Sequence, residues 1–204
     1  MLREWKTEWM KLRRRKVELL LLAFLGFTFL WCAWILSDAD AEALEDGYRW
    51  IFSNLSIINT ILLPTMLAML ASRICDMEIK GNTLKLICTM ENKGRLFDMK
   101  FLTGSLYLIL YIGAELLLLY VCGRGYGFGE PMQLRHVLYF MLQNVTVSLV
   151  VYLLQVMLSF RFENQIIPLA AGLFGSFIGL FSWFFPDTSL FRWIFVWGHY
   201  SLLH

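Results

Sequence analysis

The stretch VELLLLAFLGFTFLWCAWIL, residues 17 to 36, decides the fold of this chain. Its single charged residue is Glu18, at the very start, and nearly all of the remainder is apolar. About 20 such residues in a helix cross the roughly 30 Å hydrocarbon core of a bilayer. Because that core offers no water to backbone polar groups, a run of this length must be helical. Residues 17–36 are therefore predicted to be a transmembrane helix.

The composition of the whole chain agrees with this first run. Of 204 residues, 58% are hydrophobic and 17% are charged, and the mean hydropathy is +0.60. These values lie above the range of soluble domains and indicate an integral membrane protein. The formal net charge of +2 is too small to favour nucleic acid as a partner.

Four more apolar runs follow, at residues 51–72, 101–122, 137–159 and 166–185. Each is long enough to cross a membrane, and none alternates apolar and polar residues as a half-buried strand does. The sequence therefore predicts an all-α, polytopic helical bundle of five spans, forming a single transmembrane domain over residues 1–204.

The basic residues predict the orientation of the bundle. Fourteen of the 18 Lys and Arg residues precede the first span, separate the second from the third, or follow the fourth. Since positively charged loops stay on the cytoplasmic side, the N-terminus is predicted to be cytoplasmic. The acidic loop 37–47 and the glycine-rich loop 123–131 then face outward.

Residues 1–16 carry a pattern of their own. Leu2, Trp5, Trp9 and Leu12 share one helical face, and basic residues cover most of the remainder. A helix of this kind lies in the headgroup plane of a membrane. It is either an elbow that braces the first span or a general topogenic anchor.

The segment DMEIKGNTLKLICTMENKGR, residues 76–95, lies between the second and third spans. Leu84, Ile87 and Cys88 form an apolar side, while Lys85 and Lys93 stay in water. The pattern predicts a short amphipathic helix on the cytoplasmic side. Such a helix either docks in a groove on a soluble partner or follows the membrane surface as a connector.

This segment resembles the one that follows the second span in type-two ABC export permeases, and most closely that of lantibiotic self-protection (immunity) permeases. The residues that carry the resemblance are Glu78, Gly81, Asn82, Thr83, Lys85, Arg95 and Lys100. The resemblance implies that the segment contains a coupling helix that contacts a separate ABC ATPase. The coupling residues are then Glu78, Gly81, Asn82, Thr83, Lys85, Ile87 and Arg95.

Further expectations follow from the same resemblance. ATP and Mg²⁺ would bind the partner ATPase dimer rather than this chain, which would carry no cofactor. A second permease subunit, the same or related, would complete the transporter in a bacterial plasma membrane. Its substrate would be a hydrophobic or amphipathic antimicrobial peptide. The family has six spans, so we expect a sixth beyond residue 204, with residues 186–204 lying at the outer interface through Trp193, Trp197 and Tyr200.

No enzymatic motif is present in the sequence. It contains neither a GxxxxGK[ST] phosphate loop nor an HExxH zinc motif. The three histidines, His136, His199 and His204, are not spaced as a metal pair. The chain is therefore predicted to be a non-catalytic permease without a metal site.

Polar residues inside the spans are the remaining functional clues. A charge at the bilayer centre costs about 2.5 to 3.5 kcal/mol on insertion scales, so Glu115 must be protonated, paired or next to water. It either lines the substrate path with Asn59, Gln143 and Asn144, or it is structural and bonds a neighbour such as Gln143 or Asn144.

The fifth span carries small residues at Ala171, Gly175 and Gly179. A strip of this kind lets another helix approach closely, either within the chain or from a second permease subunit. We favour a seam between two permeases. Two other functions stay open: a permease for lipid or drug export, and a non-transporting scaffold or sensor that recruits a cytoplasmic partner.

Overall fold

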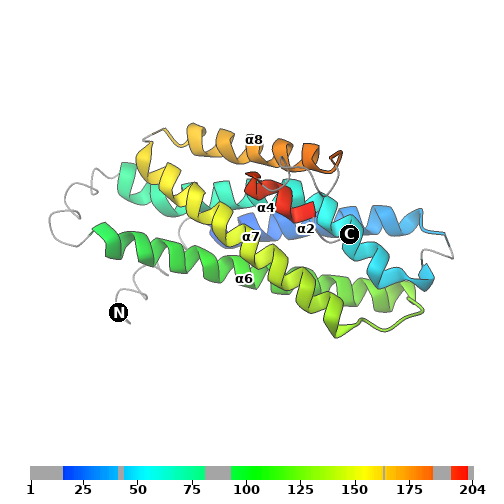
Figure 1. Ribbon diagram of the computed structural model, residues 1–204. Helices are drawn as coiled ribbons and strands as arrows, with labels where there is room; N and C mark the ends of the chain where they lie inside the picture. Colours follow the sequence, from blue (N-terminus) through cyan, green and yellow to red (C-terminus); the bar gives the residue numbers. More distant parts are fainter. Residues whose placement is uncertain (1–15, 41–43, 81–92, 163, 186–193, 202–204) are drawn as a thin grey trace.

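The computed structural model describes residues 16–40, 44–80, 93–162, 164–185 and 194–201. Within these ranges the chain is a helical bundle without strands, which confirms the predicted fold class (Figure 1). The elements are α2 (Val17–Ser37), α4 (Gly47–Lys80), α6 (Lys93–Tyr126), α7 (Leu134–Arg161), α8 (Ile166–Ser182) and the 3₁₀ helix η1 (Val196–Ser201).

Four of the described helices are long and apolar enough to cross a membrane: α2, α4, α6 and α7. The fifth predicted span is the helix α8, which is also apolar but has 17 residues. At 1.5 Å per residue it is about 25 Å long, at the lower limit for a crossing. The helices α4 and α6 have 34 residues each and extend well beyond the runs that hydropathy marked.

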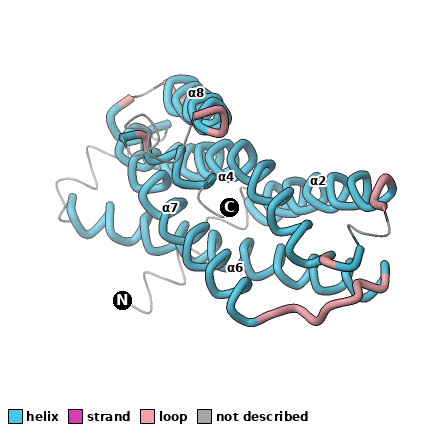
Figure 2. Tube along the Cα trace, turned by 45° about the vertical axis from the view of Figure 1, so that its right-hand side comes forward, coloured by secondary structure: helices cyan, strands magenta, loops and turns pink. Residues whose placement is uncertain are grey.

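The helix α4 forms the centre of the bundle. It contacts α2, α6, α7, α8 and η1, and 67% of its most apolar stretch is buried, against 22% for α2. Figures 1 and 2 show α8 on one side of α4, with α6 on the other side and α7 crossing diagonally. The helices around α4 leave large apolar side chains exposed on the outside of the bundle.

The ends predicted to be cytoplasmic meet at one end of the bundle. The Arg73 guanidinium on α4 donates a hydrogen bond of 3.3 Å to the carbonyl of Lys16, just before α2. Lys16 has a left-handed backbone conformation (φ 51°), so the chain changes direction immediately before the first span. The predicted elbow, residues 1–15, lies outside the described residues.

The small-residue strip of α8 packs against other parts of the same chain. A Cβ on Gly172 would collide with Ala68 of α4, and one on Gly175 would collide with the Trp197 indole of η1. At Gly179 the obstacle is the Thr60 side chain of α4. Of the two alternatives for this strip, the structure shows the contact within the chain at Gly175 and Gly179. Ala171, on the same helix, is half-buried.

The C-terminal part differs from the expectation that residues 186–204 lie at the outer interface. Residues 186–193 and 202–204 are outside the described ranges, but η1 packs between α4, α7 and α8. The Tyr200 side chain is 1% exposed, and its hydroxyl lies 2.8 Å from that of Ser148, near the middle of α7. The expectation is wrong for Trp197 and Tyr200, because the Trp197 indole fills the space at Gly175 of α8 and Tyr200 is buried against Ser148 of α7.

Candidate functional site

The predicted coupling segment joins the two longest helices of the bundle. Residues 81–92 lie outside the described residues, and with them Gly81, Asn82, Thr83, Lys85 and Ile87. Glu78 lies in the last turn of α4, and Arg95 lies in the first turn of α6. Each helix is about 51 Å long and so exceeds the hydrocarbon core by roughly 20 Å. The segment therefore connects two long helices that each reach across the bundle.

The base of α6 is fixed to α7 next to this segment. The Lys100 side chain is fully buried, and the Tyr152 hydroxyl of α7 donates a 3.1 Å hydrogen bond to the Lys100 carbonyl. The Tyr152 ring stacks on Phe101 with centroids 5.8 Å apart. Gly104 permits this approach, because a Cβ there would collide with Tyr152. A displacement of α6 would thus be passed on to α7.

A buried polar cluster joins three spans in the middle of the bundle. Glu115 of α6 and Asn59 of α4 are both fully buried, and the Asn59 amide donates a 3.2 Å hydrogen bond to the Glu115 carboxyl group. The Thr28 hydroxyl of α2 lies 3.2 Å from that of Tyr111, and both hydroxyls lie close to the same carboxyl. The Asn59–Glu115 bond pairs polar groups that would be costly in hydrocarbon, whereas Glu115 Oε1 and Asn59 Oδ1 are buried without a hydrogen-bond partner.

The predicted partners of Glu115 are wrong in detail. The Gln143 amide donates a 2.5 Å hydrogen bond to the His199 carbonyl, and the Asn144 amide donates to the Phe140 carbonyl of its own helix at 2.9 Å. The partner is instead Asn59, because α4 lies at the centre of the bundle and packs against α6. The structure brings Glu115 together with Asn59 and separates that pair from the contacts that Gln143 and Asn144 make.

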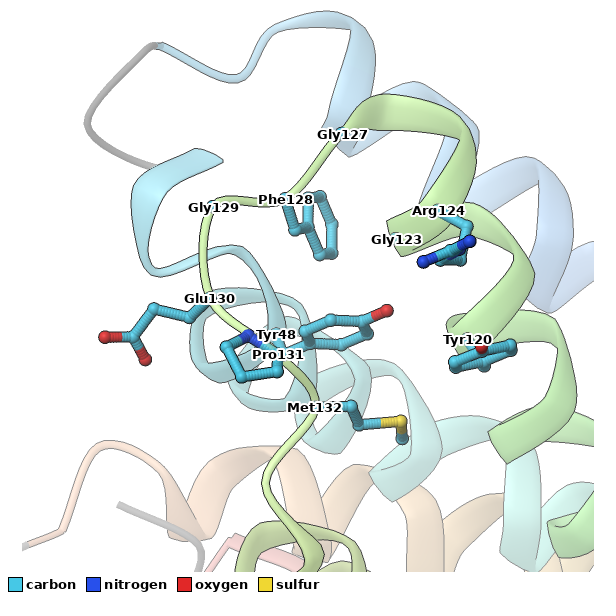
Figure 3. A pocket seen from close by; sticks show the side chains of 10 residues that line it. All are labelled: Tyr48, Tyr120, Gly123, Arg124, Gly127, Phe128, Gly129, Glu130, Pro131 and Met132. Atoms are coloured by element: carbon cyan, nitrogen blue, oxygen red, sulfur yellow. The ribbon is translucent and has the colours of Figure 1, made fainter.

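A pocket opens at the predicted outer end of the bundle, where α6 gives way to α7. Its volume is about 600 Å³. Figure 3 shows the residues that line it, which are Tyr48, Tyr120, Gly123, Arg124, Gly127, Phe128, Gly129, Glu130, Pro131 and Met132. From the sequence, this loop was predicted only to be an outward-facing turn. The pattern that could have indicated a pocket is the combination of an arginine, aromatic residues and glycines between two spans.

Comparison with known proteins identifies the family. A family model described as ABC-2 family transporter protein matches residues 5–179, which is most of the chain. No curated protein and no solved structure matches it. The matched region contains the four long apolar helices and nearly all of α8, and its two longest helices border the predicted coupling segment. This chain belongs to the ABC-2 family of transporter proteins and is the membrane-spanning permease component of an ABC transporter.

Proposed function

We propose that this permease, driven by a separate ABC ATPase dimer that binds ATP and Mg²⁺, removes an amphipathic antimicrobial peptide of the lantibiotic class from the bacterial plasma membrane. The observation that carries the proposal is the pair of 34-residue helices, α4 and α6, that enclose residues 81–92. A helix in this segment that docks on the ATPase would move the central helix of the bundle directly.

The surface of the bundle supports a substrate that arrives through the lipid. Large apolar side chains are exposed on α2, α6, α7 and α8, as at Leu30, Leu117, Leu142 and Phe174. In contrast, Glu115 and Asn59 are buried within the bundle and bonded to each other. An amphipathic peptide could slide along such apolar faces from the membrane. A second permease subunit would provide the opposite wall of that path.

The test is reconstitution with the candidate ATPase. The two proteins should co-purify, and a lantibiotic should stimulate ATP hydrolysis in lipid nanodiscs. A drug or a lipid that stimulates hydrolysis while the peptide does not would replace the proposed substrate. Co-purification with no transport of any substrate would instead support the scaffold or sensor.

The coupling role has its own test within the same preparation. Lys85→Ala should lower peptide-stimulated hydrolysis on the order of tenfold, the value of a lost charge-assisted hydrogen bond, and leave expression unchanged. Asp98→Asn is the matched control, because Asp98 is exposed on α6 beyond the segment. Equal activity of Lys85→Ala and the wild type would contradict the docking role.

A further inference from the structure

The outer pocket is assembled by interlocking rings and glycines. The Phe128 ring covers Gly47 at the start of α4, and the Tyr48 ring covers Gly123 near the end of α6. The two rings meet edge to face, with centroids 5.0 Å apart and planes at 86°. A Cβ at either glycine would collide with the opposing ring. The two glycines therefore allow the start of α4 to pack closely against the end of α6 and the loop that follows it.

Backbone hydrogen bonds hold the loop in the same position. The Phe128 amide donates to the Gly123 carbonyl at 3.1 Å, and the Gly129 amide donates to the Leu44 carbonyl at 3.2 Å. Gly127 has a positive φ of 69°, which glycine adopts at no steric cost and which turns the chain back toward α4. The pocket is therefore a preformed feature of the fold, built from segments far apart in the sequence.

Three residues that line the pocket carry side-chain hydrogen-bond donors: Tyr48, Tyr120 and Arg124. Figure 3 shows the Tyr48 hydroxyl and the Arg124 guanidinium directed toward the same space beside Tyr120, whereas the Glu130 carboxylate points away. Arginine presents a planar fork of N–H groups that matches the oxygens of a phosphate, and phenol hydroxyls supply further donors. The C-terminal end of α6 favours a cation and so accounts for Arg124 alone, but it does not account for the two tyrosines.

The position of the pocket indicates where a phosphate would come from. Tyr is enriched at the level of lipid headgroups, and Arg side chains near helix ends extend to the same level. The pocket lies where α6 ends and α7 begins. The two helices that the pocket loop connects, α6 and α7, expose Leu117, Val121, Leu134 and Leu138 within two or three turns of that loop. A phospholipid could therefore place its headgroup in the pocket and its acyl chains along these two helices.

We propose that this pocket binds the phosphate group of a membrane phospholipid, with Arg124 as the principal contact and the Tyr48 and Tyr120 hydroxyls as additional donors. The site is separate from the coupling segment and does not depend on which substrate the transporter exports. It gives the outer end of the permease a specific lipid ligand.

The experiment measures lipid binding to the purified full chain by native mass spectrometry. Dioleoylphosphatidic acid is the probe, and dioleoylglycerol, which lacks the phosphate, is the comparison. Arg124→Gln should weaken binding of the phosphatidic acid about tenfold, and Tyr48→Phe about threefold. Arg135→Gln should stay within about twofold of the wild type. Arg135 is the matched control, since it is exposed at the start of α7 and is not among the residues that line the pocket.

Other results would overturn the proposal or reassign the ligand. Equal losses in Arg124→Gln and Arg135→Gln would show diffuse surface charge, and equal binding of dioleoylglycerol would show that the phosphate is not recognised. Displacement of the lipid by millimolar inorganic phosphate, dependent on Arg124, would keep the phosphate site but make free phosphate its ligand. Tyr120→Phe is a second variant of the same pocket. It keeps the aromatic ring and removes only the hydroxyl of a half-exposed residue, so a loss of binding in this variant does not come from misfolding.

Discussion

At the residue scale, Glu115 is a fully buried ionisable side chain inside a span. Hydropathy and position identified it as an ionisable group in a span, and the structure shows it fully buried and bonded to Asn59. The sequence did not identify Asn59 as the partner, since a polar residue's position along one helix does not determine which neighbouring helix it faces. That choice depends on how α4 and α6 rotate about their axes when they pack.

We expect Asn59→Ala to destabilise the protein by about 1 to 3 kcal/mol, because the fully buried Glu115 carboxyl loses its amide donor. Thermal unfolding in detergent measures the change. The control is Asn54→Ala, since Asn54 is half-buried and donates only to the Trp50 carbonyl of its own helix. The double variant Asn59→Ala with Glu115→Gln should lose less than the sum of the single losses. Equal destabilisation by Asn54→Ala and Asn59→Ala would contradict the pairing.

The stability cost of a glycine-to-alanine substitution should differ between helical glycines of this bundle. Gly175→Ala would push the new methyl group into the Trp197 indole, and overpacking of this kind costs about 1 to 3 kcal/mol. Gly113→Ala meets nothing within 4 Å and should change stability by no more than about 1 kcal/mol. Unfolding in detergent compares the two variants. A neutral Gly175→Ala would show that Trp197 does not occupy this face.

At the scale of elements, the brace between α6 and α7 connects the coupling segment to the rest of the bundle. Tyr152→Phe keeps the ring but removes the hydrogen bond to the Lys100 carbonyl, which should cost about 0.5 to 1.5 kcal/mol. In the reconstituted transporter it should also lower substrate transport per ATP hydrolysed. Tyr139→Phe is the control, because that tyrosine is exposed and its ring alone contacts Arg135. If Tyr152→Phe transports as much substrate per ATP hydrolysed as the wild type, the Tyr152–Lys100 contact does not transmit movement from α6 to α7.

The elements that the sequence predicted well are those set by local composition. The apolar runs mark α2, α4, α6, α7 and α8, because hydropathy sums over a window and needs no knowledge of packing. Window-averaged hydropathy did not predict η1, because this helix is short and carries aromatic residues typical of the membrane–water interface. Only the notch that Gly175 and Gly179 leave on α8 explains why Trp197 packs inside.

At the scale of the molecule, the short segment 76–95 led to the right family, since the match to the ABC-2 transporters covers residues 5–179. The outer pocket could not be predicted in this way. It combines the start of α4, the end of α6 and the loop beyond, and no local pattern indicates that Tyr48 lies beside Arg124. Family membership follows from a motif, whereas a site between distant segments follows only from the tertiary fold.

The orientation of the whole bundle gives the last prediction. With the native cysteines replaced by serine, a cysteine at Asp40 or Glu130 should react with a membrane-impermeant maleimide added to intact cells. A cysteine at Asp98 or Asn164 should react only after the membrane is opened. All four positions are exposed, so burial does not limit labelling. The expectation rests on the excess of basic residues at one end of the bundle, where Arg73 meets Lys16. Labelling of Asp98→Cys in intact cells would place the coupling segment outside, beyond the reach of any cytoplasmic ATPase.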